Sequence, residues 1–175
     1  GSIDMMAHLT TTQAKQLGDD YNVVEGTMNL VQGLYLNNSF EPFKNEQVRQ
    51  ALCYGIDRDE IIDMVSDGKG VKVGSSMFPN FRKYFEPELA DKYSYDVDKA
   101  KELLAEAGYG DGFSFTITVP ANYPQHVDTA QIIAEQLKKI GVTAEINQVE
   151  WNTWLDDTYG NRNFEATLVG VDASY

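Results

Sequence analysis

The sequence has one cysteine, few basic residues and no long apolar run. Cys53 has no second thiol with which to form an internal disulfide, and its place between Leu52 and Tyr54 in a helix-like segment predicts a buried thiol. The 14 Lys and Arg residues are outnumbered by 27 Asp and Glu residues, which gives a net charge of −13. Nucleic acids attract clustered basic side chains, and a membrane-spanning helix needs about 18 apolar residues in succession. The composition therefore argues against a nucleic-acid partner and against a spanning helix.

Motifs that carry common chemistries are also missing. The sequence contains no GxGxxG, P-loop, GxSxG, HExxH or CxxC pattern. Its two histidines, His8 and His126, lie far apart, which argues against a shared metal site. The acidic run that starts at Asp57 has Ile61 where the fifth position of a calcium loop needs an oxygen ligand. We therefore expect no metal and no cofactor.

What the sequence does have is a pair of well-marked helices near its first third. Asn45 is a cap residue, and the segment that follows it has apolar residues at a spacing of three and four, which predicts a helix with one buried side. Asp57 with Glu60 three positions on resembles a capping box and predicts a second short helix, which Gly68 ends. Neither helix contains recognisable chemistry, so both are predicted to be scaffold.

The rest of the chain alternates strand and helix patterns, and residues 70–87 form a long loop. Apolar–polar alternation predicts strands over 3–9, 113–119, 142–149 and 164–171 and extended segments over 21–25 and 28–36. Helical periodicity predicts helices that begin at Thr10 and at Trp151 and helices over 96–108 and 125–140. A strand, a long helix and a second strand make a βαβ unit with parallel strands. The fold class is therefore predicted to be α/β.

Ligands of open α/β sheets bind beyond the carboxyl ends of the strands. In this sequence those ends fall at residues 120–126, 150–151 and 170–175. Trp151 and Trp154 share one side of a helix, and we expect at least one to be core; Trp151 is the better pocket candidate because it follows a strand end directly. Asp172 follows the last strand, where a carboxylate is either simply solvated or able to pair with a cationic group.

Four segments in order resemble the family 5 extracellular solute-binding proteins, which include the oligopeptide- and dipeptide-binding receptors of bacterial ABC importers. They are VRQAL through IDRDEII over 48–62, YDVDKAKELLAEAGY over 95–109, IGV over 140–142 and VEW over 149–151. The resemblance implies a periplasmic-binding-protein-like (type II) lobe with a mixed sheet, incomplete as a fragment. Residues 1–36 would belong to the hinge-side part of the first lobe and 37–175 to the front of the second.

The resemblance also implies a binding protein without catalytic residues. Such a receptor closes on a peptide or a solute of similar size and delivers it to ABC permease subunits. We expect it to be a monomer, located in the periplasm or at the cell surface as a lipoprotein. Its export signal would lie upstream of this sequence.

Residue by residue, the resemblance gives a ligand-binding set. Trp151 matches a tryptophan that lines a side-chain pocket, and Gly170 matches a glycine whose backbone pairs with peptide ligands as an added strand. Val171 stands at a tryptophan position, and Ser174, followed by Tyr175, stands where an aspartate binds the peptide amino terminus. Asp172 lies two residues earlier, in the same loop but not in register, so capture of a peptide amino terminus requires that Asp172 has taken over the role.

Three further residues, Asn122, His126 and Tyr35, match positions near the border of the ligand cavity. Alternatives remain at this stage. One is a small α/β enzyme that uses Asp172 and His126 as acid and base, which requires the two side chains to meet in one pocket. Another is a receptor-derived signalling ectodomain, and a third changes only the ligand, to a nickel chelate or an oligosaccharide.

Overall fold

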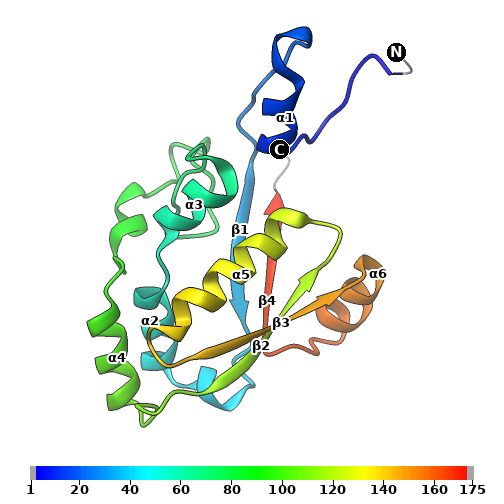
Figure 1. The fold of residues 1–175 in the computed structure, drawn as a ribbon. Helices are drawn as coiled ribbons and strands as arrows, with labels where there is room; N and C mark the ends of the chain where they lie inside the picture. Colours follow the sequence, from blue (N-terminus) through cyan, green and yellow to red (C-terminus); the bar gives the residue numbers. More distant parts are fainter. Residues whose placement is uncertain (1–2, 173–175) are drawn as a thin grey trace.

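Four strands form one mixed sheet in the order β1-β4-β2-β3 (Figure 1). The structure is a computed structural model and describes residues 3–172. The strands are β1 (Leu30–Leu36), β2 (Ser114–Pro120), β3 (Thr143–Val149) and β4 (Ala166–Asp172). β1 runs antiparallel to β4, whereas β2 is parallel to both β4 and β3. The predicted α/β class and mixed sheet are confirmed.

Helices surround this sheet unevenly. They are α1 (Thr11–Leu17), α2 (Glu46–Gly55), α3 (Arg58–Ser66), α4 (Val97–Glu106), α5 (Pro124–Lys138) and α6 (Trp151–Thr153), with short helical turns η1 (Gly18–Asp20), η2 (Glu41–Lys44), η3 (Pro87–Asp91) and η4 (Trp154–Gly160), the last of these π-helical. In Figure 1, α5 crosses the sheet, α2, α3 and α4 stand together to its left, and α6 lies to the right.

The core lies between α5, the α2–α4 pair and one face of the sheet. The inward residues of β2 are Phe115, Ile117 and Val119, and each is at most 2% exposed. They pack in one cluster with residues of the three helices, among them Val48, Leu104 and Leu137. β2, α5 and β3 form the predicted βαβ unit, and its two strands pair in parallel at seven positions. Periodicity alone therefore located the centre of the fold.

Two predicted extended segments are not strands. Residues 3–9 have no strand, and Met5 is 88% exposed. Residues 21–25 are likewise outside the sheet, and β1 begins only at Leu30. An apolar run becomes a strand only where a neighbouring strand accepts its backbone hydrogen bonds, and these segments have none within the described chain.

Cys53 is exposed, so the prediction of a buried thiol is wrong. The reason is the phase of α2, whose buried residues are Val48, Ala51, Leu52 and Gly55. Position 53 falls on the opposite side of that helix, because successive residues turn by about 100°. The side chain of Leu52 therefore points to the core, whereas the side chain of Cys53 points to solvent.

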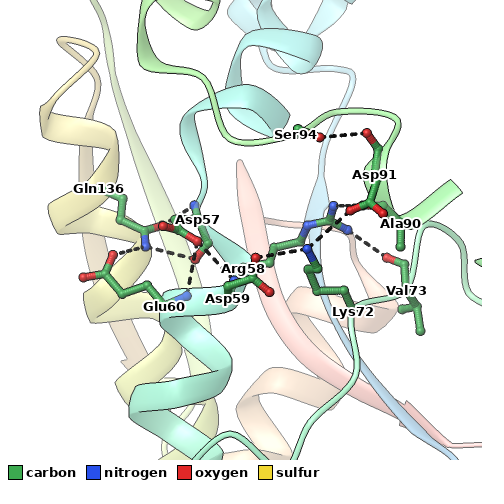
Figure 2. Close-up of polar contacts among 10 residues, drawn as sticks. All are labelled: Asp57, Arg58, Asp59, Glu60, Lys72, Val73, Ala90, Asp91, Ser94 and Gln136. Atoms are coloured by element: carbon green, nitrogen blue, oxygen red, sulfur yellow. Dashed lines mark hydrogen bonds and ion pairs between the residues drawn. The ribbon is translucent and has the colours of Figure 1, made fainter. Parts of the chain in front are cut away.

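The caps of α2 and α3 are present, with one difference. The Asn45 side chain accepts the Gln47 N–H at 2.8 Å, and the Asp57 side chain accepts the N–H groups of Asp59 and Glu60. The expected return bond from Glu60 to the Asp57 backbone is replaced by Gln136 of α5 (Figure 2). The amide of Gln136, 2% exposed, bonds both the N–H and the C=O of Asp57 and also the Glu60 carboxylate.

The long loop after α3 is fixed to that helix by basic side chains. The Arg58 guanidinium donates to the carbonyls of Val73 and Ala90, which lie near the two ends of the loop (Figure 2). Lys72 lies between the carboxylates of Asp59 and Asp91 at 3.0 and 3.4 Å. Within the loop, Phe78 is buried, as expected for an aromatic residue that packs a loop down. The loop is thus ordered by bonds to α3.

Candidate functional site

β4 has one edge that is only partly covered. It pairs with β1 at seven positions from Leu30↔Asp172 to Leu36↔Ala166, but with β2 only at Ile117↔Ala166 and Thr118↔Thr167. Beyond that point β2 and β4 spread apart, as their arrowheads in Figure 1 show. In open α/β sheets the ligand crevice lies at such strand ends, so we expect the ligand crevice of this protein beyond the carboxyl ends of β2 and β4.

Gly170 and Asp172 direct their backbone groups toward this crevice. The Gly170 N–H donates to Nε2 of His126 on α5, so it points away from β1. Backbone groups alternate in direction along a strand, and those of Asp172 therefore point the same way as those of Gly170. The side chain of Asp172 is exposed, and so is that of Val171. The predicted recognition strand thus has an edge that no other strand occupies within the described chain.

Aromatic rings line the ends of β2 and β3 beside the crevice. Tyr123, which precedes α5, meets Trp151 edge-on at a centroid distance of 5.5 Å. Trp151 in turn stacks on Trp154 at 5.3 Å with ring planes only 5° apart, and Tyr159 stacks on the other side of Trp154. Tyr123 is 43% exposed and Trp151 is partly exposed. The result is a row of rings that is exposed at both ends, at Tyr123 with Trp151 and at Tyr159.

Trp154 belongs to the core rather than to the surface of this row. It is 6% exposed, and its indole N–H donates to Oγ1 of Thr167 at 3.0 Å. The Thr167 hydroxyl donates in turn to the Thr118 carbonyl at 2.7 Å. This chain of bonds fixes η4 to the sheet. The expectation that at least one tryptophan is core is confirmed, and Trp151 is the one left for a ligand.

His126 is buried between three elements. It sits in the first turn of α5 and is 5% exposed. Its Nε2 accepts the Gly170 N–H of β4 at 3.1 Å, and its Nδ1 lies 2.6 Å from the terminal amide of Gln32 on β1. The Tyr123 ring lies 5.3 Å from the imidazole. Burial lowers the pKa of His126 below its ordinary value, because the charged ring would lose its hydration.

These bonds contradict the alternative in which Asp172 and His126 act as acid and base. Both nitrogens of His126 have partners, and neither is Asp172. The acid–base alternative needs the two side chains to meet, and no hydrogen bond of the described residues joins His126 to Asp172. That pair is therefore corrected to a structural contact between His126, Gln32 and Gly170.

The remaining predicted residues are dispersed. Asn122 is exposed in the turn between β2 and α5. Tyr35 is opposite Thr167 in the register, so its side chain points to the face of the sheet away from Gln32 and His126. Ser174 and Tyr175 lie outside the described residues. The structure thus joins His126 to Gly170 on the face of the sheet that α5 covers, with Tyr123 in contact with both His126 and Trp151. Tyr35 lies on the other face, which Trp154 contacts through Thr167.

Sequence reasoning missed two residues of this region, Gln32 and Tyr123. Gln32 is the one polar side chain in the run from Leu30 to Leu36, and a polar residue inside an apolar strand is a signal for a buried partner. Tyr123 was within the strand-end segment 120–126 but had no spacing pattern to single it out.

Membrane-spanning helices and metal-binding clusters are both absent from the described part of the chain. Between residues 3 and 172, no helix has the length and apolar character needed to cross a bilayer. The same residues contain no group of three or more His, Cys, Asp and Glu side chains placed to hold a metal ion.

Comparison with known proteins gives one consistent result. The family model described as bacterial extracellular solute-binding proteins, family 5, middle region matches residues 1–175. Oligopeptide-binding protein AppA of Bacillus subtilis is 35% identical over 151 residues, which cover 79% of this chain and 28% of AppA. Heme-binding protein A of Haemophilus influenzae is 40% identical over 119 residues, which cover 66% of this chain and 21% of that protein.

Solved structures agree. The ABC transporter-associated periplasmic binding protein DppA of Helicobacter pylori, in complex with the peptide STSA, is 30% identical with a TM-score of 0.80. The match covers 94% of this chain and 31% of that one. The predicted periplasmic-binding-protein-like fold is confirmed. The chain spans less than a third of the length of these relatives.

Proposed function

This chain belongs to family 5 of the bacterial extracellular solute-binding proteins, and from this membership we propose that it forms part of the receptor of an ABC importer. The receptor binds a peptide, or a solute of similar size, between two lobes and delivers it to permease subunits in the membrane. AppA of B. subtilis is named for oligopeptide binding, and DppA of H. pylori was solved with a peptide and is described as ABC transporter-associated.

The observation that supports this proposal most directly is the open edge of β4 from Gly170 to Asp172. An extended peptide can add to such an edge as a further strand, and its main chain then supplies most of the affinity whatever its side chains are. In this proposal Asp172 pairs with a cationic group of the ligand, in place of the carboxylate expected at position 174. The backbone groups of Val171 face Val31 of β1, so Val171 contributes through its exposed side chain.

The aromatic end of the crevice supplies the apolar part of the proposed site. Trp151 and Tyr123 keep exposed ring surface beside the strand ends, where a side chain of the ligand can pack. Asn122 stands next to them in the turn before α5 and contributes a polar group at the rim. Tyr35 lies on the face that Trp154 contacts through Thr167, and it is retained in the proposal as a residue near the border of the ligand cavity.

The two-lobe division is part of the proposal. Residues 1–36 belong to the hinge-side part of the first lobe and residues 37–175 to the front of the second. β1 lies within the first range but pairs with β4 along its whole length, so in this proposal it is the strand that connects the lobes. We further propose that the receptor acts outside the cytoplasm, free in the periplasm or as a cell-surface lipoprotein, and that it is a monomer without enzymatic activity.

Isothermal titration calorimetry on the full-length protein tests the ligand class. The titrants are the peptide Ser-Thr-Ser-Ala, a mixed peptide pool, a nickel–histidine chelate and a linear oligosaccharide. We expect saturable heat with the peptides alone. Heat from the chelate or the oligosaccharide, with none from any peptide, would overturn the peptide proposal and leave the receptor role with another ligand.

A further inference from the structure

The His126 imidazole connects three segments that are remote in sequence. Gln32 lies 94 residues before it and Gly170 lies 44 residues after it. Its partner at β4 is a backbone N–H at the open edge, at the residue where β4 has already left β2. A Cβ on Gly170 would lie 3.2 Å from Cε1 of His126 and 3.0 Å from Leu30. The ring is therefore packed directly against the backbone of the proposed binding strand.

The contacts define the protonation of the ring. Nε2 accepts the Gly170 N–H, so it carries no proton, and the single proton of the neutral ring is on Nδ1. The nitrogen and oxygen of a glutamine amide exchange places by a half-turn of the group, and the oxygen of Gln32 is the atom that can accept from Nδ1–H. The ring is thus the neutral Nδ1–H tautomer, with a donor on one side and an acceptor on the other.

A proton on Nε2 would break this arrangement, because two N–H groups would then face each other at Gly170. No nearby charge offsets that cost. Gln32 of β1 is uncharged, Tyr123 before α5 presents a ring, Asp128 of α5 and Asp172 at the end of β4 are exposed, and burial is the one cause of the shift in the His126 pKa. The contact is therefore complete near neutral pH and is lost on protonation.

We propose that His126 is a positioning residue for the ligand-binding edge of β4: as the neutral Nδ1–H tautomer it fixes Gly170 in the extended geometry to which a ligand backbone pairs. The role of this edge rests on the proposed function, whereas the contact itself does not. Occupation of the Gly170 N–H also restricts pairing by a ligand to the Gly170 carbonyl and to Asp172. Acidification releases the strand end and weakens binding.

The direction of the pH effect follows from the lowered pKa of His126. The unfolded chain takes up the proton at the ordinary pKa of about 6.5, before the folded chain does. The stabilising contribution of the neutral ring is thus fully present above that pH. It is lost as the pH falls from there through the lowered value.

Hydrogen–deuterium exchange on the full-length protein tests the contact without any ligand. Segment 168–172 is followed at about pH 7.5 and at the lowest pH at which circular dichroism still shows the folded protein, with correction for intrinsic exchange, in the wild type, His126→Gln and His126→Ala. The Oε1 atom of glutamine can accept the Gly170 N–H but does not titrate. We expect protection in the wild type to fall by at least about fivefold at the lower pH, the equivalent of one net hydrogen bond. His126→Gln should stay protected at both values, and His126→Ala should be unprotected at both.

Equal loss of protection in the wild type and His126→Gln would assign the titration to another group and overturn the proposal. So would a wild type that is equally protected at both values, or a His126→Ala variant as protected as the wild type. The His126→Gln comparison keeps the test valid if His126→Ala fails to fold.

Calorimetry with the peptide Ser-Thr-Ser-Ala at the same two pH values tests the link to binding. We expect affinity to fall by at least about fivefold on acidification in the wild type and to stay constant in His126→Gln. Affinity that is independent of pH in the wild type, together with the expected exchange result, would overturn the positioning role. Absence of binding at every pH would instead remove the proposed function, while the exchange result would still decide on the contact.

Discussion

Trp151 and Trp154 lie three positions apart and stack with nearly parallel rings, yet their surroundings differ. Trp154 is buried and donates to Thr167, so its contribution is to packing. Trp151 keeps part of its surface open beside Tyr123. Substitutions at the two positions should therefore change different quantities, which are stability at Trp154 and ligand affinity at Trp151.

Trp151→Ala should lower the affinity of the full-length protein for peptides about tenfold, or about 1.4 kcal/mol, because the ligand loses an aromatic surface against which to pack. Calorimetry with Ser-Thr-Ser-Ala measures it. Tyr159→Ala is the matched control: Tyr159 stacks on the far side of Trp154 and is 72% exposed, so its removal should leave affinity unchanged. Equal losses in both variants would show that the ring row acts as a whole rather than through Trp151.

Alanine substitutions at Gly108 and Gly112 distinguish the cost of backbone strain from the cost of a steric clash. Both have positive φ, 81° and 85°, but a Cβ on Gly112 would lie 1.8 Å from the Gly141 carbonyl oxygen, whereas a Cβ on Gly108 meets nothing within 4 Å. Gly108→Ala should cost about 1–2 kcal/mol from strain alone. Gly112→Ala should cost more, about 3 kcal/mol or above, because the turn must also shift. Denaturant unfolding of the two variants measures the difference, and equal values would contradict the clash.

The sequence alone indicated some of these residues and not others. The three-residue spacing of the tryptophans placed them on one side of a helix, and strand-end position selected Trp151. The partners of His126 had no such signal, since Gln32 and Gly170 are brought to it by long-range strand pairing. The spacing of residues along the sequence shows which side chains share one side of a helix, but it does not show which distant residues those side chains contact.

Helix α3 shows how a local element is completed by tertiary contacts. Its Asp57 cap satisfies two N–H groups at the start of the helix, but the N–H of Asp57 itself is satisfied by Gln136 from α5. Gln136 is buried and makes all three of its bonds to the first turn of α3 or its cap. The start of α3 therefore depends on α5.

Gln136→Leu should destabilise the protein by about 2–3 kcal/mol, because the Asp57 N–H loses its partner in a partly buried place and the Asp57 C=O keeps only its bond from Ile61. Thermal and denaturant unfolding measure it. Gln131→Leu is the control, because it makes the same substitution on the exposed side of the same helix. Its free energy of unfolding should stay within about 0.5 kcal/mol of the wild-type value. A similar loss in both variants would assign the effect to helix α5 rather than to the cap.

At the scale of elements, periodicity predicted most of the fold. Strand β2 and helix α5 have long regular patterns, and both were located to within two residues. The strand expected over 3–9 was wrong because apolar character does not supply a pairing partner, and Cys53 was misplaced because its apolar neighbours lie on another side of α2. The π-helical turn η4 has no sequence signature of its own.

Within residues 3–172, the edge of β4 that faces β2 is paired only as far as Thr167. The sheet order places β4 between β1 and β2, and the separation of β2 from β4 leaves the Gly170–Asp172 edge exposed to one side. No local pattern predicted that order, because the antiparallel β1–β4 pair joins residues more than 120 positions apart. The site is therefore one wall of the proposed clamp.

The 175-residue chain alone should bind Ser-Thr-Ser-Ala at least about 100-fold more weakly than the full-length protein, because a ligand on one wall stays largely in water. Calorimetry on the two proteins at the same pH measures the ratio. Circular dichroism of the shorter chain, before and after titration, is the control for folding. Equal affinities would contradict the two-lobe proposal.

Helix α5 (Pro124–Lys138) makes contacts near both of its ends, and the two contacts require a fixed rotation and distance between the residues that make them. His126 near its start contacts β4, and Gln136, ten residues later, contacts α3. One added residue between them would rotate one contact relative to the other by about 100° and displace it by about 1.5 Å. Natural or designed changes in the length of α5 should consequently be restricted to its outer ends, while changes of residue type on its exposed side remain free.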